Sequence, residues 1–178
     1  MNRKIHLFIA CTLDGYIARE NGSIDWLLEM PNPGNTDHGY NSFIEGIGCL
    51  IMGRRTYEDV LGSGIAWPYG EQKTWVVTGN TGYRVSTPAT FILNEITAKS
   101  IVRIREQSDK DTWLAGGGGL ISRFLSLDLV DEMVISVIPL ILGKGIPLFP
   151  DRPKETKLIL TRTESFDTGV VNLCYKRA

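Results

Sequence analysis

The feature that most constrains the fold of this chain is an alternation of short apolar runs with stretches of helical periodicity. The patterns predict strands over 49–53, 73–78, 90–93 and 111–115, and helices over 38–46, 55–62, 97–108 and 120–128. The predicted strands are apolar rather than alternating. This combination indicates an α/β fold with a mainly parallel sheet and helices on both of its faces.

The two ends of the chain add a central strand and a hairpin. The run "KIHLFIACT" (4–12) is apolar on both faces and stops before the turn pair Asp14-Gly15, so we expect a central strand there. A strand over 131–139 precedes the Gly/Pro-rich loop "LILGKGIPLFP", and residues 156–166 and 169–177 read as a hairpin. Residues 18–38 form a long predicted loop, which is often functional in a compact domain.

Composition limits the classes of protein to which the chain can belong. A length of 178 residues fits one domain, 1–178, that folds without a metal or a disulfide. Lys+Arg 19 against Asp+Glu 20 argues against nucleic-acid binding. Three widely separated cysteines and two histidines predict no metal site, and indicate reduced thiols in a cytoplasmic protein.

The amino terminus resembles a signal peptide only superficially. Its apolar stretch is interrupted early by Asp14-Gly15, and no apolar run approaches the roughly 20 residues that span a bilayer. We therefore expect no membrane association.

Four consecutive glycines lie between the predicted strand 111–115 and the predicted helix 120–128. At such a junction the free amides at the start of the helix can bind phosphate, and the missing side chains allow its approach. The dinucleotide fingerprint G-x-G-x-x-G fails, because Ile121 and Ser122 stand where a third glycine would be needed. Two interpretations remain open: a nucleotide site, or glycines needed only for tight packing.

The stretch "LIMGRRTYEDVLG" suggests a second anion site. Gly53 ends an apolar strand, and Arg54, Arg55 and Thr56 stand where the next helix begins. Arginine holds phosphate in a forked geometry, although a solvated basic turn is the alternative. Two such sites on one sheet suit a dinucleotide, and the arginines favour NADP over NAD because the 2′-phosphate needs a cationic partner.

Five segments resemble the dihydrofolate-reductase-like superfamily in their order along the chain. They are "IACTLDGYIA", "LIMGRRTYE", "VVT", "LAGGGGLISRFL" and "LVDEMVISVIPLILGKGIPLF". They are most similar to stand-alone members that correspond to the reductase half of the riboflavin-biosynthesis enzyme RibD. The resemblance implies a three-layer α/β/α fold, with a mostly parallel central sheet and an antiparallel C-terminal hairpin.

The resemblance also implies a function. It points to NADPH-dependent hydride transfer to a pyrimidine or pterin-like substrate, foremost the reaction of 5-amino-6-(5-phosphoribosylamino)uracil reductase. Dihydrofolate reduction and a non-catalytic NADPH-binding role are the alternatives. The family often pairs subunits through its C-terminal strands, so a homodimer is expected.

The resemblance assigns the cofactor residues in three groups. Ala10 and Ile17 would line the nicotinamide pocket. The adenosine-phosphate side would be formed by Gly53, Arg54, Arg55, Thr56 and Thr78. The pyrophosphate would be bound by Ala115, Gly116, Gly117, Gly118, Gly119 and Leu120.

Two catalytic candidates follow from the same resemblance. An ungapped comparison places the acid that supports protonation at Asp37, for which a helix N-cap is the alternative role. Ser136 matches a strand hydroxyl that bonds this acid in the family, or else it is a hydroxyl satisfied within the sheet. Asp14 is the other acid near the nicotinamide end, and beside Gly15 it is also a typical turn former.

The substrate side departs from dihydrofolate reductases. Those enzymes hold the glutamate carboxylate of the substrate with an arginine just before the strand that matches 73–78, whereas this chain has Glu71 and Gln72 there. An acid would repel that carboxylate. Four aromatic residues in or beside loops either stack on a flat heterocycle or cover the core: Trp26, Tyr40, Trp67 and Tyr69. Lys144 is assigned either a substrate-phosphate contact or a tight turn.

Overall fold

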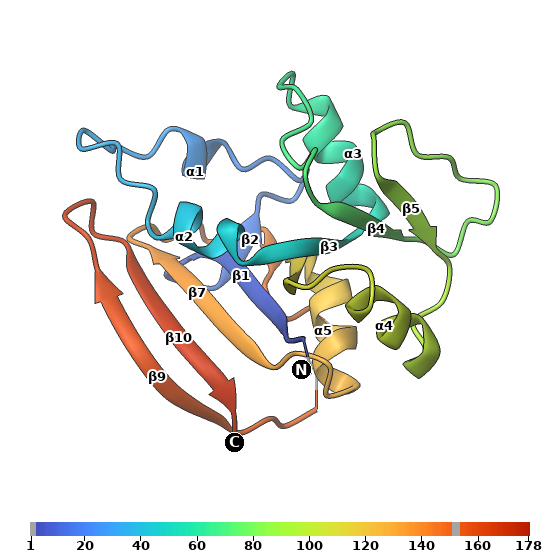
Figure 1. The fold of residues 1–178 in the computed structure, drawn as a ribbon. Coiled ribbons are helices and arrows are strands. Elements are labelled where there is room, and N and C mark those ends of the chain that lie inside the picture. The colour runs from blue at the N-terminus through green and yellow to red at the C-terminus, as the bar shows by residue number, and fades with distance from the viewer. Residues whose placement is uncertain (1–2, 151–153) are drawn as a thin grey trace.

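The computed structural model describes residues 3–150 and 154–178 (Figure 1). Its strands are β1 (Ile5–Thr12), β2 (Tyr16–Ala18), β3 (Ile47–Gly53), β4 (Lys73–Val77), β5 (Thr90–Leu93), β6 (Asp111–Gly116), β7 (Glu132–Ile138), β8 (Ile146–Pro147), β9 (Leu158–Ser165) and β10 (Val171–Arg177). Its helices are α1 (Asp25–Leu28), α2 (Tyr40–Glu45), α3 (Arg54–Gly62), α4 (Ala98–Arg105) and α5 (Gly118–Ser126).

The core of the fold is an eight-stranded sheet with the order β5-β4-β3-β6-β1-β7-β10-β9. The strands from β5 to β7 in this order are parallel, whereas β10 is antiparallel to both β7 and β9. The predicted parallel sheet and C-terminal hairpin are therefore confirmed. The predicted central position of the first strand is confirmed as well, because β1 lies between β6 and β7.

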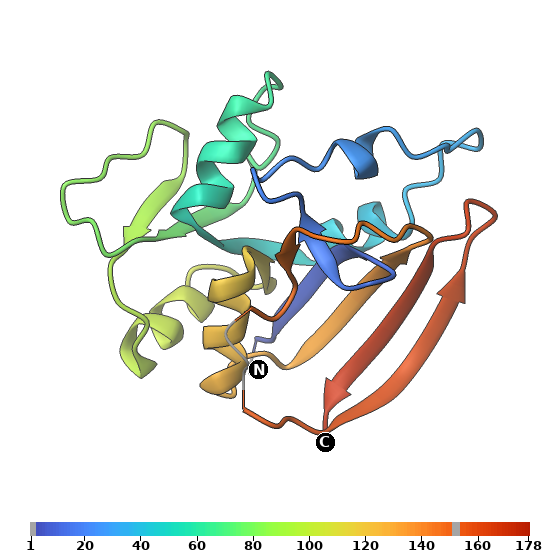
Figure 2. The ribbon, with the colours of Figure 1, turned by 180° about the vertical axis from the view of Figure 1, so that it is seen from behind.

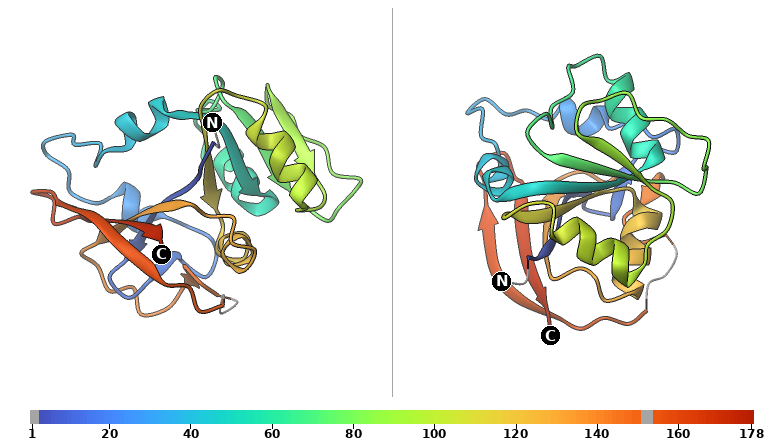
Figure 3. Two further views of the ribbon diagram at one scale, coloured as in Figure 1. Left: turned by 60° about the horizontal axis from the view of Figure 1, so that its bottom comes forward. Right: turned by 45° about the vertical axis from the view of Figure 1, so that its right-hand side comes forward.

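Helices cover both faces of the sheet, which gives three layers (Figures 1 and 3). On one face, Ile101 and Ile104 of α4 pack with Ile121 and Phe124 of α5 over the sheet. On the other face, Tyr57 of α3 and flanking aromatic residues form a second cluster. The spacing of three or four residues between the buried positions of α4 and α5 is the apolar stripe expected of a helix with one face in the core.

Two small elements differ from the sequence prediction. Residues 18–38 contain the four-residue helix α1, and the Gly/Pro-rich loop contains β8, which pairs antiparallel with β2. This pairing brings the two segments of backbone so close that a Cβ atom at Gly145 would lie 2.3 Å from the carbonyl oxygen of Ala18. The segment around β8 and the β1–β2 turn lie together in the rear view (Figure 2).

Helix boundaries also shift. The predicted helix over 97–108 ends at Arg105, and the one predicted over 120–128 begins two residues earlier, at Gly118. The fourfold glycine run is thus divided between the end of β6 and the first turn of α5. Among residues 3–150 and 154–178, no helix has the length and apolar character that a membrane crossing requires.

Candidate functional site

The two glycine-bearing strand ends meet at one edge of the sheet. β3 and β6 are neighbours, and Met52 pairs with Gly116. A Cβ atom on Gly53 would lie 3.9 Å from both the carbonyl oxygen of Gly116 and the amide nitrogen of Gly117. The Gly116–Gly117 peptide is cis, and Gly116 has a φ of 122°, which favours glycine. The structure therefore brings the two predicted anion sites side by side.

Both helices that follow these strands begin without a side-chain cap. Gly53 is the N-cap of α3 and Gly117 is the N-cap of α5, and neither carries a capping hydrogen bond from a side chain. The first amides of a helix have no partner inside it, and they carry a partial positive charge. Two helix starts of this kind at adjacent strand ends form a surface suited to an extended anion.

The glycines of the run have different surroundings. A Cβ atom on Gly117 would stand 3.4 Å from Thr56 Oγ1, at the junction of the two helix starts. A Cβ atom on Gly118 would lie 2.6 Å from the carbonyl oxygen of Pro147, which is too close. Gly118 is therefore required for close packing against the β8 segment, whereas Gly119 is exposed.

The two arginines at the start of α3 are exposed and oriented differently. Arg54 forms an ion pair with Glu58 one turn on, at 2.9 Å, and its guanidinium lies 5.8 Å from the ring centre of Tyr83. Arg55 reaches toward the β2–α1 connection, where a Cβ atom on Gly22 would be 3.3 Å from its Nη2 atom. Both cations remain close to the helix start, where the sequence placed them.

The other predicted cofactor residues lie around the same edge. Thr78 directly follows β4; its Oγ1 accepts the amide of Asn80 at 3.1 Å, so its hydroxyl shapes the turn. Ile17 and Leu120 pack against the core on the α4–α5 side. Ala115 packs on the α3 side. Ala10, near the end of the central strand, packs against the cluster formed by Trp26, Ile138 and Val170.

Asp37 accepts hydrogen bonds from two backbone amides, one in the turn before α2 and one in its first turn. Its Oδ2 accepts the amide of Asn41 at 2.8 Å, and its Oδ1 accepts the amide of Gly39 at 3.0 Å. These two hydrogen bonds, that from Asn41 first, lower the pKa of the exposed carboxyl below its usual range. A proton donor would need the opposite shift. The N-cap residue of α2 is Gly39, so Asp37 accepts an amide of the first helical turn from outside the helix and not as the N-cap that was the alternative role.

Ser136 does not bond Asp37. Its hydroxyl donates to Oδ1 of Asn172 at 2.7 Å, and Nδ2 of Asn172 donates to the carbonyl oxygen of His38 at 2.8 Å. In place of the expected hydrogen bond between Ser136 and the Asp37 carboxylate, Ser136 bonds the uncharged side chain of Asn172 on β10. Sequence reasoning missed Asn172, because a single polar residue in a predicted hairpin gives no signal of a contact with residue 38.

Asp14 joins the β1–β2 turn to the β7–β8 loop, at the predicted nicotinamide end. Its carboxylate accepts hydrogen bonds from the Thr12 hydroxyl at 2.6 Å and from the amides of Leu142 and Gly143. The hydroxyl of Thr12, followed by those amides, lowers the pKa of Asp14 to about 2. Its observed role extends the predicted turn former, because it binds the β7–β8 loop as well as its own turn.

Lys144 belongs to that β7–β8 loop. It pairs with Glu20 at 3.0 Å, and both side chains are largely exposed. This surface ion pair is the contact that the structure gives to Lys144.

The four candidate aromatic residues divide into two groups. Tyr69 packs edge-on against Trp113 and Trp67, and Tyr40 packs against the same Trp113. Burial raises the pKa of Tyr69 to about 12. With these contacts, Tyr40, Trp67 and Tyr69 cover the hydrophobic core on the α3 side of the sheet.

Trp26 lies elsewhere, in a cluster with Ile138 and Val170. Its indole nitrogen is buried and has no hydrogen-bond partner among the described residues. Ala10 packs against this cluster, so Trp26 belongs to the cluster that a predicted nicotinamide residue contacts.

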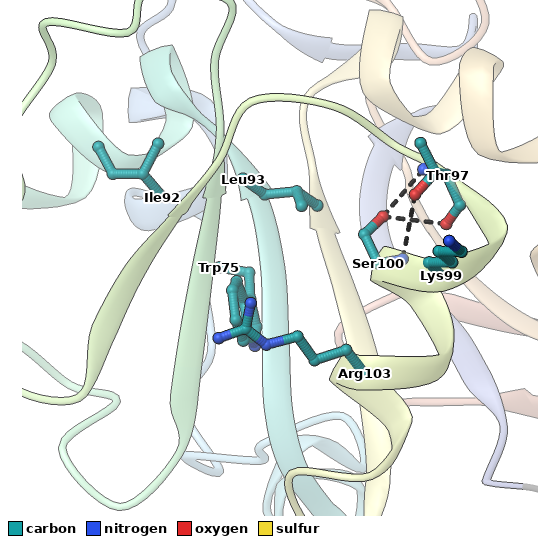
Figure 4. Close-up of a pocket in the computed structure, with 7 residues that line it drawn as sticks. All are labelled: Trp75, Ile92, Leu93, Thr97, Lys99, Ser100 and Arg103. Carbon is teal, nitrogen blue, oxygen red and sulfur yellow. Dashed lines mark hydrogen bonds between the residues drawn. The ribbon is translucent and has the colours of Figure 1, made fainter.

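A cavity of about 300 Å³ lies away from these residues, between β4, β5 and α4. In its lining, the guanidinium of Arg103 lies over the Trp75 ring, 5.5 Å from the ring centre (Figure 4). Its lining holds none of the predicted site residues; it consists of Trp75, Ile92, Leu93, Thr97, Lys99, Ser100 and Arg103.

Neither the cysteines nor the metal-binding residue types point to a reactive site in the described parts of the chain. Cys11, Cys49 and Cys174 are free and buried, and burial raises the pKa of Cys11 to about 11. Within the described ranges, no group of three or more His, Cys, Asp or Glu side chains is placed to hold a metal ion.

The fold is that of the dihydrofolate reductase-like proteins. Dihydrofolate reductase from Enterococcus faecalis superposes with a TM-score of 0.68 at 15% identity, over 99% of this chain and 98% of that chain. A putative riboflavin biosynthesis protein from Shewanella sp. PV-4 superposes with a TM-score of 0.88 at 32% identity, over 98% and 99% of the two chains.

Sequence comparison identifies the family. The family model described as RibD C-terminal domain matches residues 63–172. The uncharacterised protein YwjB of Bacillus subtilis is 42% identical over 178 residues, the full length of both chains. This chain belongs to the RibD C-terminal domain family, a family of riboflavin-biosynthesis-type reductases.

Proposed function

We propose that the chain is an NADPH-dependent reductase that transfers a hydride to a pyrimidine or pterin-like substrate. The reaction that we favour is the reduction of 5-amino-6-(5-phosphoribosylamino)uracil or a close relative. The observation that carries the proposal is the pair of uncapped helix starts at the adjacent ends of β3 and β6, with Arg54 and Arg55 beside one of them. Membership of the RibD C-terminal domain family supports the reductase class.

The residues at this edge fit the chemistry of NADPH. The helix starts at Gly53 and Gly117 offer amides to a pyrophosphate, and the vacant Cβ position of Gly117 leaves the approach open. Arg54 and Arg55 would hold the 2′-phosphate, which requires that Arg54 exchange its ion pair with Glu58 for one with the ligand. When bound, NADPH would supply the hydride. The protein would supply orientation, with Ala10 and Ile17 at the nicotinamide end.

Proton delivery in this proposal does not use Asp37. Its carboxylate is engaged by two backbone amides and has a lowered pKa, so it stays ionised near neutral pH. The hydroxyl of Ser136 is likewise committed to Asn172. We therefore propose that an ordered water gives the proton, and that the side chains act by positioning.

Dihydrofolate is the less suitable acceptor. Glu71 is exposed and Gln72 is buried at the place where the sequence comparison required an arginine for the glutamate tail. The charge of Glu71 would repel that tail.

A second candidate function is NADPH binding without catalysis. The commitment of both Asp37 and Ser136 to structural hydrogen bonds favours it, because neither residue is placed as a proton donor. In either case we expect a cytoplasmic protein, in keeping with its three free, buried cysteines.

One experiment separates these alternatives. NADPH and NADH are titrated by fluorescence, and NADPH oxidation is then followed with the ribosylamino-pyrimidine phosphate, dihydrofolate and dihydropterins. We expect tighter binding of NADPH than of NADH, and oxidation with the ribosylamino compound. Binding without oxidation of any acceptor supports the second candidate. The absence of a thermal shift at saturating NADPH contradicts both.

A further inference from the structure

Two buried polar side chains lie next to each other in the sheet, in the row that also carries Ala10. Ala10 pairs with Ser136 across β1 and β7, and Ser136 pairs with Asn172 across β7 and β10. Ser136 is 5% exposed and Asn172 is 1% exposed. Buried polar groups are unfavourable unless they are hydrogen-bonded, so the partners of this pair determine why it is tolerated.

Asn172 uses both ends of its carboxamide. Its Oδ1 accepts the Ser136 hydroxyl at 2.7 Å, and its Nδ2 donates to the carbonyl oxygen of His38 at 2.8 Å. A backbone carbonyl can only accept, so this contact fixes which end of the amide faces the turn at 37–39. The side chain thus connects a strand of the C-terminal hairpin to the turn that precedes α2.

That turn has a conformation that needs external support. His38 has a φ of 52° and Gly39 a φ of 85°, and a left-handed residue other than glycine persists only where its surroundings hold it. The His38 ring bonds the hydroxyl of Thr168 through Nε2 at 2.9 Å. A Cβ atom on Gly39 would lie 3.8 Å from Nδ2 of Asn172, so the turn rests on this side chain.

We propose that Asn172 is a positioning residue for the acceptor end of the site. It fixes the turn at 37–39 and the start of α2 relative to Ala10 and Ser136. Its catalytic consequence rests on the proposed reductase function. The cofactor edge at Gly53 and Gly117 lies on β3 and β6, on the other side of β1, so loss of Asn172 should affect the acceptor and spare NADPH.

The first test replaces Asn172 by leucine, which is similar in size and removes both hydrogen bonds. We expect the KM for the acceptor to rise about tenfold, the scale of one lost buried hydrogen bond, while the Kd for NADPH stays unchanged. Thr161→Val is the matched control, because it removes a hydrogen bond of the same hairpin, to the carbonyl of Cys174 at 3.0 Å. It should alter neither constant.

Asn172→Asp gives a readout that a general packing defect would not move. Its ionised carboxylate would face the His38 carbonyl, and only the protonated acid could donate to it. The acceptor KM of this variant should therefore approach the wild-type value at low pH and rise as pH increases. Three other ionisable groups lie on the segments in contact with Asn172: Asp37 and His38 on the turn, and Glu164, the register partner on β9. Asp37→Asn, His38→Gln and Glu164→Gln serve as pH controls.

A measurement without catalysis keeps this inference separate from the proposed function. Hydrogen–deuterium exchange of the amides at 37–43 should accelerate in Asn172→Leu and not in Thr161→Val. If the wild-type protein fails to bind or oxidise NADPH, the proposed function is lost and exchange still decides the role of Asn172. Unchanged exchange in Asn172→Leu would overturn the inference, as would equal weakening of acceptor and NADPH binding.

Discussion

Replacement of the consecutive residues Gly117 and Gly118 should affect different properties: NADPH binding for Gly117 and the stability of the fold for Gly118. Gly117 has a φ of −82°, which any residue adopts, and its vacant Cβ position faces Thr56 at the proposed pyrophosphate site. Valine there should leave the melting temperature of the free protein nearly unchanged and raise the Kd for NADPH at least about tenfold, or about 1.4 kcal/mol.

Gly118→Ala is the matched contrast to this variant. Its Cβ atom would meet the carbonyl oxygen of Pro147 at 2.6 Å, so it should destabilise the free protein by about 1–3 kcal/mol. Thermal denaturation and cofactor titration of both variants check the pair. Equal NADPH affinity in Gly117→Val and wild type would contradict the assignment of Gly117.

Asp37 should act on stability rather than on proton transfer. With its pKa lowered by the amides of Asn41 and Gly39, the carboxylate stabilises the fold above its unfolded pKa of about 3.9, and this contribution is lost as pH falls through the lower folded value. We expect Asp37→Ala to lower the melting temperature at pH 7, and the pH–rate profile of Asp37→Asn to match wild type between about pH 5 and 8. A turnover that collapses in Asp37→Asn, with an unchanged melting temperature, would restore its role as the acid.

At the scale of elements, one carboxylate connects the β1–β2 turn to the β7–β8 loop. The hydrogen bonds of Asp14, led by that from Thr12, place its pKa at about 2, below the unfolded value of about 3.9. Its stabilising contribution is therefore complete above about pH 5 and is lost as pH falls through about 2. The melting temperature of Asp14→Ala should lie below wild type at pH 7, and the difference should close toward pH 2.

The control for this prediction is Asp167→Ala, in the turn of the β9–β10 hairpin. Because Asp167 is exposed, its replacement should give no such convergence. A gap between Asp14→Ala and wild type that persists at pH 2 would mean that packing, rather than the carboxylate, holds the loops.

Elements with a strong apolar pattern could be predicted from the sequence, and short ones could not. β3 and β6 read as buried strands because their apolar runs are continuous. β2 and β8 span three and two residues, and their pairing depends on Gly145 fitting beneath Ala18, which no local pattern reveals.

The same limit applies to the candidate site. Glycines and arginines at the ends of predicted strands indicate an anion site by their residue types alone. The link from Ser136 to His38 runs through Asn172. Asn172 and His38 are 134 residues apart in the sequence, so their contact can be seen only in the folded structure.

At the scale of the whole molecule, the β9 edge is the surface on which we propose that two copies meet. β9 is the last strand of the sheet and has one side without a partner strand among residues 3–150 and 154–178, and Leu158, Ile159 and Leu160 are 40%, 47% and 52% exposed. Exposed apolar edge strands pair readily with other chains. Leu160→Asp should convert a dimer to a monomer by calibrated light scattering.

Val102→Asp is the control for the dimer prediction. Val102 is 54% exposed on α4, away from the hairpin, so its replacement should leave the mass unchanged. A wild-type protein that is monomeric at working concentration would contradict the proposed dimer.

The central position of β1 governs how the chain can acquire its structure. Among the described strands, β1 lies between β6 and β7, whose residues follow it by roughly a hundred positions or more. On the ribosome, one edge of β1 therefore stays open until residue 116 has emerged and the other until residue 138, and the entropy of closing such long loops slows its docking. Fragments that end before β7 should accordingly remain uncompacted and prone to aggregation.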